Sequence, residues 1–170
     1  NLHSSQMPAL IKAGEVGSFL HVTNPAEANR LQQYAGESRL GIPLIIGIDA
    51  IHGNGLVSGS TIYPSPITMA SSWNLDLVRQ ANIETAREMR ATGSHWAFAP
   101  NVDIARDPRW GRVGETFGED PFLVGEMGVA VIKGLQQGDF KGSEKVIANA
   151  KHFVAGGDPI NGLNFSPMDV

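Results

Sequence analysis

The chain has 170 residues, with 13 Lys and Arg against 17 Asp and Glu, for a formal net charge of -4. No block of basic residues could follow a phosphate backbone, so nucleic acid is not an expected partner. No apolar run approaches the roughly 20 residues of a membrane-spanning helix, so a membrane is not expected either. The sequence contains no cysteine, which excludes disulfides, thiolate metal sites and thiol nucleophiles.

The length predicts one domain, or part of one, because the larger α/β barrels typically need about 250 residues. Asn1 is not an initiator methionine, and the most motif-rich stretch lies just before the last residues. We therefore expect residues 1–170 to be one piece of a longer protein. The composition itself leaves the cellular compartment open.

Four apolar runs at intervals along the chain predict β-strands. In chain order they cover Gly14–Val22, Ile42–Ile48, His95–Pro100 and Lys145–Phe153. The second run is apolar throughout rather than alternating, which is typical of a strand buried on both faces in a parallel sheet.

A helix is predicted after each of the first three strands. Asn24, Asn74 and Asp120 stand where an N-cap is expected, and Pro25 occupies the first helical position after Asn24. Gly93 marks the end of the second helix. Regular alternation of strands and helices predicts an α/β fold built from parallel βα units.

Two strand-to-helix connections are unusually long. They run for about 25 residues from Asp49 to Trp73 and about 20 from Asn101 to Asp120, whereas ordinary βα connections have roughly 2 to 6. In parallel α/β folds these loops share the edge at the carboxyl ends of the strands, where ligands bind. We therefore expect a built site at that edge.

Polar side chains gather in the segments that should meet there. Asp49 stands in the string GIDAIHGN, the string RDPRWGR lies in the second long loop, and Lys151 and His152 end the fourth strand. Each has a structural explanation of its own: a turn cap, an Asp/Arg loop around a Trp110 plug, and a solvated strand end. Together they predict a pocket of charged hydrogen-bond partners with an apolar wall, suited to a polyhydroxylated ligand such as a sugar.

Other chemistries find no support in the sequence. The motifs G-x-S-x-G, G-x-x-x-x-G-K-[ST] and G-x-G-x-x-G before a helix are all missing, as is a His pair at i and i+4. The five histidines are scattered along the chain. No metal and no cofactor is therefore expected.

Three strings, in this order and separation, carry a family resemblance. GIPLIIGIDAIHG, FAPNVDIARDPRWGRVGETFGEDP and AKHFVAGG resemble the N-terminal barrel domain of glycoside hydrolase family 3, of the β-glucosidase type. The resemblance implies about half of a TIM-type (β/α)8 barrel, with the other half and the following domain outside residues 1–170. It also implies four residues that hydrogen-bond the hydroxyls of the terminal glycosyl unit, namely Asp49, Arg112, Lys151 and His152.

The implied function is that of a fragment of a retaining, exo-acting β-glucosidase that hydrolyses terminal non-reducing β-D-glucosyl residues. Its partners would be β-glucosides or β-glucan oligosaccharides. The family places the nucleophilic Asp in an SDW-like motif and usually the acid/base in a following domain. This chain has no SDW, so neither Asp49, Asp103 nor Glu115 is assigned a catalytic role. A periplasmic or secreted location is compatible with the resemblance.

The stretch KHFVAGGDPINGLN narrows the subtype. It lacks the KHFPGHG pattern of N-acetylglucosaminidase members, and β-xylosidase members tend to differ in the same loop, so a β-glucosidase or exo-β-glucanase is favoured.

Two alternatives stay open: a non-catalytic sugar-binding module, and a barrel lyase that uses Lys151 as a Schiff-base amine. Unpaired strand edges also predict self-association, or pairing with the other half of the barrel.

Overall fold

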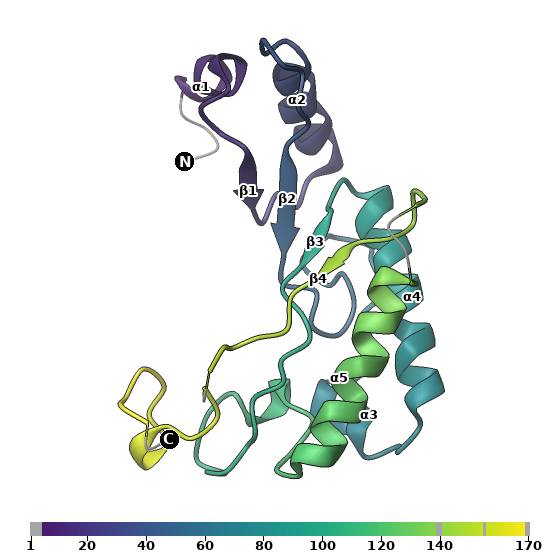
Figure 1. Ribbon diagram of the computed structural model, residues 1–170, viewed down its shortest axis with the longest axis vertical. Helices are drawn as coiled ribbons and strands as arrows, with labels where there is room; N and C mark the ends of the chain where they lie inside the picture. Colours follow the sequence, from purple (N-terminus) through teal and green to yellow (C-terminus); the bar gives the residue numbers. More distant parts are fainter. Residues whose placement is uncertain (1–4, 139–140, 155, 169–170) are drawn as a thin grey trace.

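The computed structural model describes residues 5–138, 141–154 and 156–168 (Figure 1). Both ends of the expected domain, residues 1–4 with Asn1 and residues 169–170, lie outside the described residues. In chain order the elements are α1 (Met7–Ala13), β1 (Ser18–Leu20), α2 (Pro25–Gly36), β2 (Ile45–Ile48), α3 (Pro66–Ala70), α4 (Leu75–Ala91), β3 (Trp96–Ala97), η1 (Val113–Glu115), α5 (Pro121–Gln136), β4 (Ile147–Ala148) and η2 (Ile160–Gly162).

The four strands form one parallel sheet in the order β1-β2-β3-β4. The register pairs Phe19 with Ile46 between β1 and β2, and Ala97 with both Ile48 and Ala148 across β3. This confirms the predicted α/β fold of parallel βα units, with four strands making half of an eight-stranded barrel. The fourth unit is represented by its strand and the loop 149–168, since no α-helix follows β4 in the described residues.

The strands are shorter than the apolar runs that predicted them, and β2 shows why. Pro43 has no backbone N–H to give to a sheet. The Gln32 side chain then satisfies both backbone groups of Leu44, donating to its carbonyl at 2.9 Å and accepting from its N–H at 3.0 Å. Pairing with a neighbouring strand therefore begins only at Ile45.

All three predicted N-caps are confirmed. At the start of α2, the Asn24 side chain accepts from the N–H groups of Ala26 and Glu27. At the start of α4, the Asn74 side chain accepts from the Leu77 N–H at 3.1 Å. At the start of α5, the Asp120 side chain accepts from the Leu123 N–H at 2.7 Å. In the described part of the chain, no helix is both long and apolar enough to cross a bilayer.

Two short helices, α1 and α3, are not predicted from the sequence. They have 7 and 5 residues, too short for a helical periodicity to become visible. Packing holds them in place instead: Ile11 of α1 and Met69 and Ala70 of α3 are buried. The helix α3 lies inside the long connection from Asp49 to Trp73 and so gives part of that loop a fixed shape.

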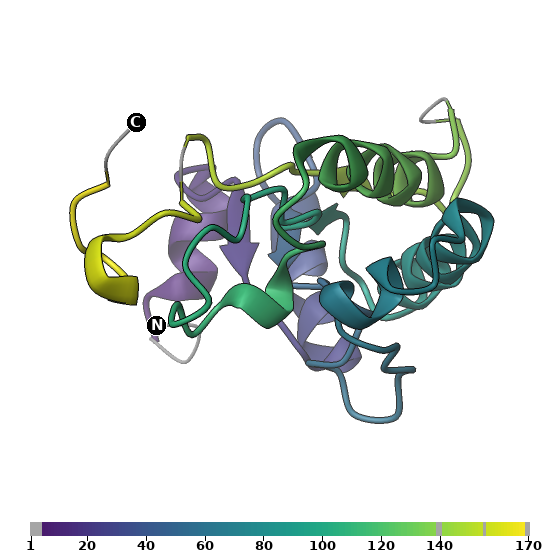
Figure 2. The ribbon, with the colours of Figure 1, turned by 90° about the horizontal axis from the view of Figure 1, so that it is seen from below.

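The apolar core has two parts. One joins α1 and α2 to β1 and β2 around Leu31 and Ile46, and the other joins α3, α4 and α5 to β2 and β3 around Ile48 and Met127. Helices α4 and α5 lie side by side in both views (Figures 1 and 2). They approach closely because Gly134 has no side chain: a Cβ there would lie 2.5 Å from the Arg79 carbonyl oxygen.

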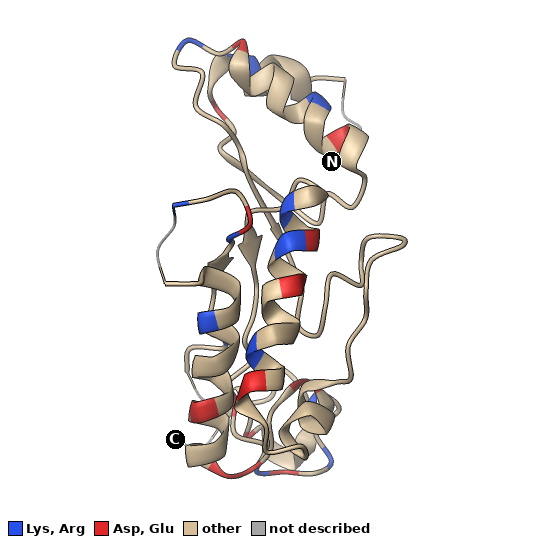
Figure 3. Ribbon diagram, turned by 90° about the vertical axis from the view of Figure 1, so that its right-hand side faces the viewer, with Lys and Arg blue, Asp and Glu red and all other residues tan. Residues whose placement is uncertain are grey.

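Charged residues lie on the outside of this helical layer. Figure 3 shows basic and acidic residues alternating along the exposed side of α4. Arg87 bonds Glu84 one turn earlier at 2.6 Å and Glu144 from the loop before β4 at 3.1 Å. The polar face of α4 therefore points away from the sheet, as expected for a helix that covers a parallel sheet.

Within the described residues, the sheet ends at β1 on one side and β4 on the other. Each of these strands has a single partner, and each carries an exposed apolar side chain, Leu20 at 58% and Ile147 at 39% exposed. Unpaired N–H and C=O groups along such strands are ready to pair with another chain.

We predict that the segment 1–170 expressed alone associates in a concentration-dependent way, because its two sheet edges are open. Sedimentation velocity over a range of protein concentrations measures this directly. Replacing Leu20 and Ile147 together by Lys should shift the distribution toward the monomer, since charged edges resist pairing. A segment that stays monomeric at every concentration contradicts the prediction.

Candidate functional site

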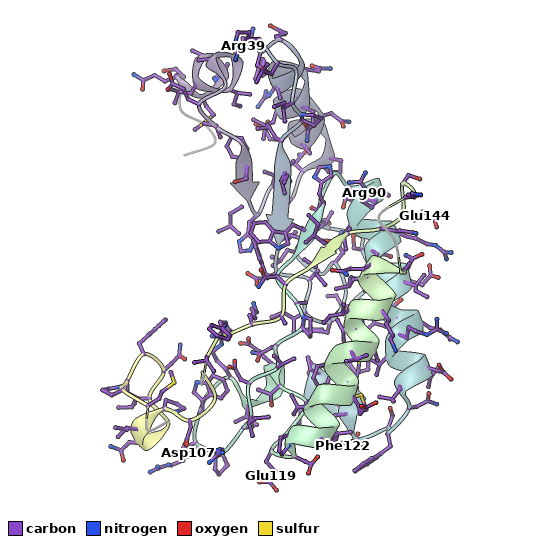
Figure 4. The ribbon with its side chains drawn as sticks, in the orientation of Figure 1. Arg39, Arg90, Asp107, Glu119, Phe122 and Glu144 are labelled. Carbon is purple, nitrogen blue, oxygen red and sulfur yellow. The ribbon has the colours of Figure 1, made fainter. Side chains whose placement is uncertain are left out.

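The carboxyl ends of the parallel strands gather the residues that the sequence singled out. The arrowheads of β1 and β2 point the same way, toward the part of the molecule that holds the long loops (Figure 1). Figure 4 places Asp107 and Glu119, both from the second long loop, at the end opposite Arg39, which lies in a helix-to-strand connection. The strand-to-helix loops thus share one edge, as predicted.

Asp49 and Lys151 meet at this edge although 102 positions separate them in the chain. The Lys151 ammonium donates to Asp49 Oδ1 at 2.7 Å. The backbone of Lys151 is held as well, because it continues the β3–β4 pairing through a bridge to Asn101. Its N–H donates to the Pro100 carbonyl at 3.0 Å, and its carbonyl accepts from Val102 at 2.7 Å.

Arg112 and His152 form a second pair, supported by two carboxylates. One turn of η1 brings Glu115 against Arg112, which donates to both Glu115 oxygens at 3.0 and 2.7 Å. A terminal nitrogen of Arg112 lies 3.3 Å from Nε2 of His152. The other ring nitrogen of His152, Nδ1, lies 2.7 Å from Oδ2 of Asp103.

These contacts define how His152 is used. A carboxylate can only accept, so Nδ1 of His152 carries the hydrogen that goes to Asp103. Arginine can only donate, so Nε2 of His152 accepts from Arg112. The Asp103 side chain is 2% exposed and serves as the fixed support, while the His152 side chain is 37% exposed and reaches the surface of the site.

The electrostatics connect the two pairs. Burial raises the pKa of Asp49, but the hydrogen bonds and charges of Lys151 and His21 outweigh it, and the net pKa lies below 3.8. The hydrogen bond to Glu115 raises the pKa of Arg112, to which the Asp49 charge also contributes. The same bond lowers the pKa of Glu115 from 4.5. The four predicted residues therefore lie within one charged network.

Trp110 is the buried plug of its loop and does not form an exposed wall of the pocket. It is 2% exposed, and its Nε1 donates to Asn164 at 3.1 Å. The Arg112 guanidinium lies 5.9 Å from the centre of its ring, a cation–π distance. Trp110 therefore fills the inside of its loop, where its ring also supports the Arg112 guanidinium.

Two other residues of the predicted strings have structural roles. Arg109 pairs with Asp107 within the loop, with its Nη2 at 2.7 Å from Oδ2. His52, in the string GIDAIHGN, donates through Nδ1 to the Tyr63 carbonyl at 2.9 Å and ties the first long loop to itself. Neither belongs to the Asp49–Lys151 or Arg112–His152 pair.

The two glycines after the fourth strand allow the chain to pass close to the second long loop. A Cβ at Gly156 would lie 2.6 Å from Oδ1 of Asp103, and one at Gly157 would overlap the Ile104 carbonyl oxygen. Only glycine fits at such distances, so this pair seats the loop against the carboxylate that holds His152.

Sequence reasoning missed three members of the network: His21, Asp103 and Glu115. Asp103 and Glu115 were considered only as candidate nucleophiles or loop residues, and their use as supports for His152 and Arg112 is a tertiary contact. His21 follows β1 directly, and its Nε2 lies 2.9 Å from Oδ2 of Asp49. The strand-end rule that selected Asp49 applies equally to His21.

The larger of two surface cavities does not contain the predicted site residues. One of about 460 Å³ touches Lys151, His152 and Asp103. A larger one, about 690 Å³, lies between α3 and the outer face of α4 and touches none of the four predicted site residues. Among the described residues, no group of three or more His, Asp or Glu side chains is arranged to hold a metal ion.

Comparison with known proteins relates this geometry to a family. A periplasmic beta-glucosidase of Salmonella typhimurium is 36% identical over 162 residues, which cover 95% of this chain and 20% of that relative. A beta-xylosidase of Formosa agariphila is 43% identical over 150 residues, which cover 83% of this chain and 21% of the relative. The chain thus spans about a fifth of the length of the curated relatives it matches.

Solved structures agree with these relatives. A beta-glucosidase from intestinal bacteria, involved in saponin metabolism, superposes with a TM-score of 0.90 at 44% identity, over 98% of this chain and 22% of that one. A mutant beta-glucosidase from Listeria innocua in complex with laminaribiose superposes with a TM-score of 0.85 at 35% identity, over 96% and 23%. The model of the glycosyl hydrolase family 3 N terminal domain matches residues 2–167. The chain therefore belongs to glycoside hydrolase family 3.

Proposed function

We propose that the protein carrying this chain is a retaining, exo-acting β-glucosidase that removes terminal non-reducing β-D-glucosyl residues. In this proposal residues 1–170 are the first half of its barrel domain and supply the groups that bind the glycosyl unit: Asp49, Arg112, Lys151 and His152. The nucleophile and the acid/base come from outside this chain.

The observation that carries the proposal is the convergence of Asp49–Lys151 and Arg112–His152 at the carboxyl edge of the sheet. Sugar hydroxyls both donate and accept, so they pair best with a mixture of carboxylate acceptors and cationic donors. This edge offers both kinds of group within one network. Its side chains remain partly exposed, with Asp49 at 35% and Arg112 at 29%.

The relatives support the substrate class. They include beta-glucosidases of bacteria and a beta-xylosidase, and one structural neighbour is in complex with laminaribiose. By analogy with these neighbours, β-glucosides and β-glucan oligosaccharides are the substrates to test first. An aryl β-xyloside belongs in the same assay, because the xylosidase relative is 43% identical.

The lyase alternative fits the geometry less well. A Schiff-base lysine attacks as a neutral amine. Lys151 instead donates to the Asp49 carboxylate at 2.7 Å, so its nitrogen is engaged in an ion pair rather than free to attack a carbonyl. A non-catalytic sugar-binding module would use the same side chains, and an activity assay of the complete protein separates it from a glycosidase.

We predict that Asp49→Asn and Lys151→Ala in the complete enzyme each lower kcat/KM for an aryl β-glucoside. The expected loss of transition-state stabilisation is about 2 to 4 kcal/mol. This is the range for losing a charged hydrogen bond and leaving its partner unpaired, and it corresponds to about 30- to 900-fold. Steady-state kinetics with 4-nitrophenyl β-glucoside measure it.

Asp76→Asn and Lys12→Ala are the matched controls for these two variants. Asp76 lies on α4 with its side chain 83% exposed, and Lys12 lies on α1, where it pairs with Glu37. Both controls should retain the parental kcat/KM. Site variants that fold correctly and match the parent would refute the assignment of Asp49 and Lys151.

We further predict that Arg112→Lys raises KM about tenfold or more, whereas Arg109→Lys leaves KM close to the parental value. The planar guanidinium of Arg112 bonds both oxygens of Glu115, and this fixes its position. Lysine cannot make this paired contact, so its ammonium would not meet the substrate in the same place. Arg109 is 65% exposed and pairs with Asp107 within the same loop. Kinetics for both variants, with melting curves as a folding check, test the contrast; a larger KM effect at Arg109 contradicts it.

A further inference from the structure

His21 holds the side of the Asp49 carboxylate that faces away from Lys151. It is the first residue after β1, and its backbone N–H still donates to the Gly47 carbonyl at 2.8 Å. Its Nε2 lies 2.9 Å from Oδ2 of Asp49, while Lys151 bonds Oδ1. Each carboxylate oxygen therefore has its own donor, one from β1 and one from the end of β4.

The backbone of His21 is shaped for this contact. Its φ is 54°, in the left-handed region that non-glycine residues seldom adopt. The ladder hydrogen bond to Gly47 fixes the chain up to this residue, and the change to a left-handed conformation then ends the strand. The side chain is 38% exposed, so the ring borders the open part of the site.

Lys151 alone does not fix how the carboxylate is turned. An ammonium is a compact charge on a flexible stem with three rotatable donors, so it tolerates many orientations of its partner. An imidazole N–H has a single direction. Because an ionised carboxylate only accepts, Nε2 of His21 is the donor in this contact and selects one orientation of the carboxylate plane.

We propose that His21 is a positioning residue that determines glycon specificity by orienting the Asp49 carboxylate toward the sugar hydroxyls. This inference rests on the proposed function of Asp49 in binding the glycosyl unit. A carboxylate has about four acceptor positions, and the bonds to His21 and Lys151 use two of them. The direction of the other two decides which hydroxyl arrangement of the sugar is matched.

The test uses the complete enzyme and aryl β-glucosides that lack one hydroxyl each, at C2, C3, C4 or C6. The variants are His21→Leu, which removes the donor, His21→Gln, which restores an amide N–H donor, and Asp49→Asn. For each variant, kcat and KM are measured on the parent glucoside and on every deoxy substrate.

We expect His21→Leu to lower kcat/KM for the parent glucoside about tenfold, mainly through KM, and His21→Gln to recover most of the loss. For the deoxy substrate on which Asp49→Asn has lost its effect, the effect of His21→Leu should shrink by the same measure. A residue that only stabilises the loop would penalise all substrates equally and would not be rescued by Gln.

The outcomes separate the inference from the function beneath it. If Asp49→Asn lowers kcat/KM and His21→Leu does not, or lowers it equally on all substrates, the inference is overturned and the proposed function stands. If Asp49→Asn has no effect on any glucoside, both are overturned.

Should His21→Leu fail to fold, His21→Asn replaces it. Asparagine accepts the left-handed φ but is too short to reach Asp49 in the same way. A defect of His21→Asn that disappears on the same deoxy substrate supports the inference. Parental kinetics on every substrate would overturn it.

Discussion

Parallel pairing of β2, β3 and β4 is the constraint on which the site depends. Because all strands of the sheet run in one direction, the residues that follow them emerge at one edge. Asp49 and Lys151 meet at 2.7 Å for this reason, although 102 positions separate them. An antiparallel neighbour would deliver its trailing residues to the opposite edge and leave the Asp49 carboxylate without this cation.

The partly exposed side chains of the site are each held by a neighbouring group. His152 is held by the buried Asp103, and Arg112 is held by Glu115 and the Trp110 ring. Alternating signs keep the cost of gathering so many charges low, because every cation has a carboxylate within hydrogen-bond distance. Such support also limits how far the exposed groups can turn, which the proposed binding of a rigid sugar ring would require.

The half-barrel explains the distribution of apolar surface. In a closed barrel the strand edges disappear, and the side chains that point inward fill the interior. Here Leu20 on β1 and Ile147 on β4 stay exposed at the two ends of the sheet. Phe153 and Phe165 in the segment after β4 are also almost fully exposed, at 100% and 95%. The chain spans about a fifth of its relatives, so in the proposed whole enzyme this surface would face further parts of the same protein.

The sequence alone determined whatever depends on neighbours within a few positions. Helix starts are predictable at Asn24, Asn74 and Asp120, because a cap bonds only N–H groups two or three residues further on. Asp49 is recognisable as a strand-end residue because an apolar run precedes it. Tertiary structure decided the rest: the short helices α1 and α3, the burial of Trp110, and the contacts of Asp49 with His21 and Lys151. These depend on packing and on pairs of residues 28 and 102 positions apart, and no local pattern of side chains records which strand ends will become neighbours.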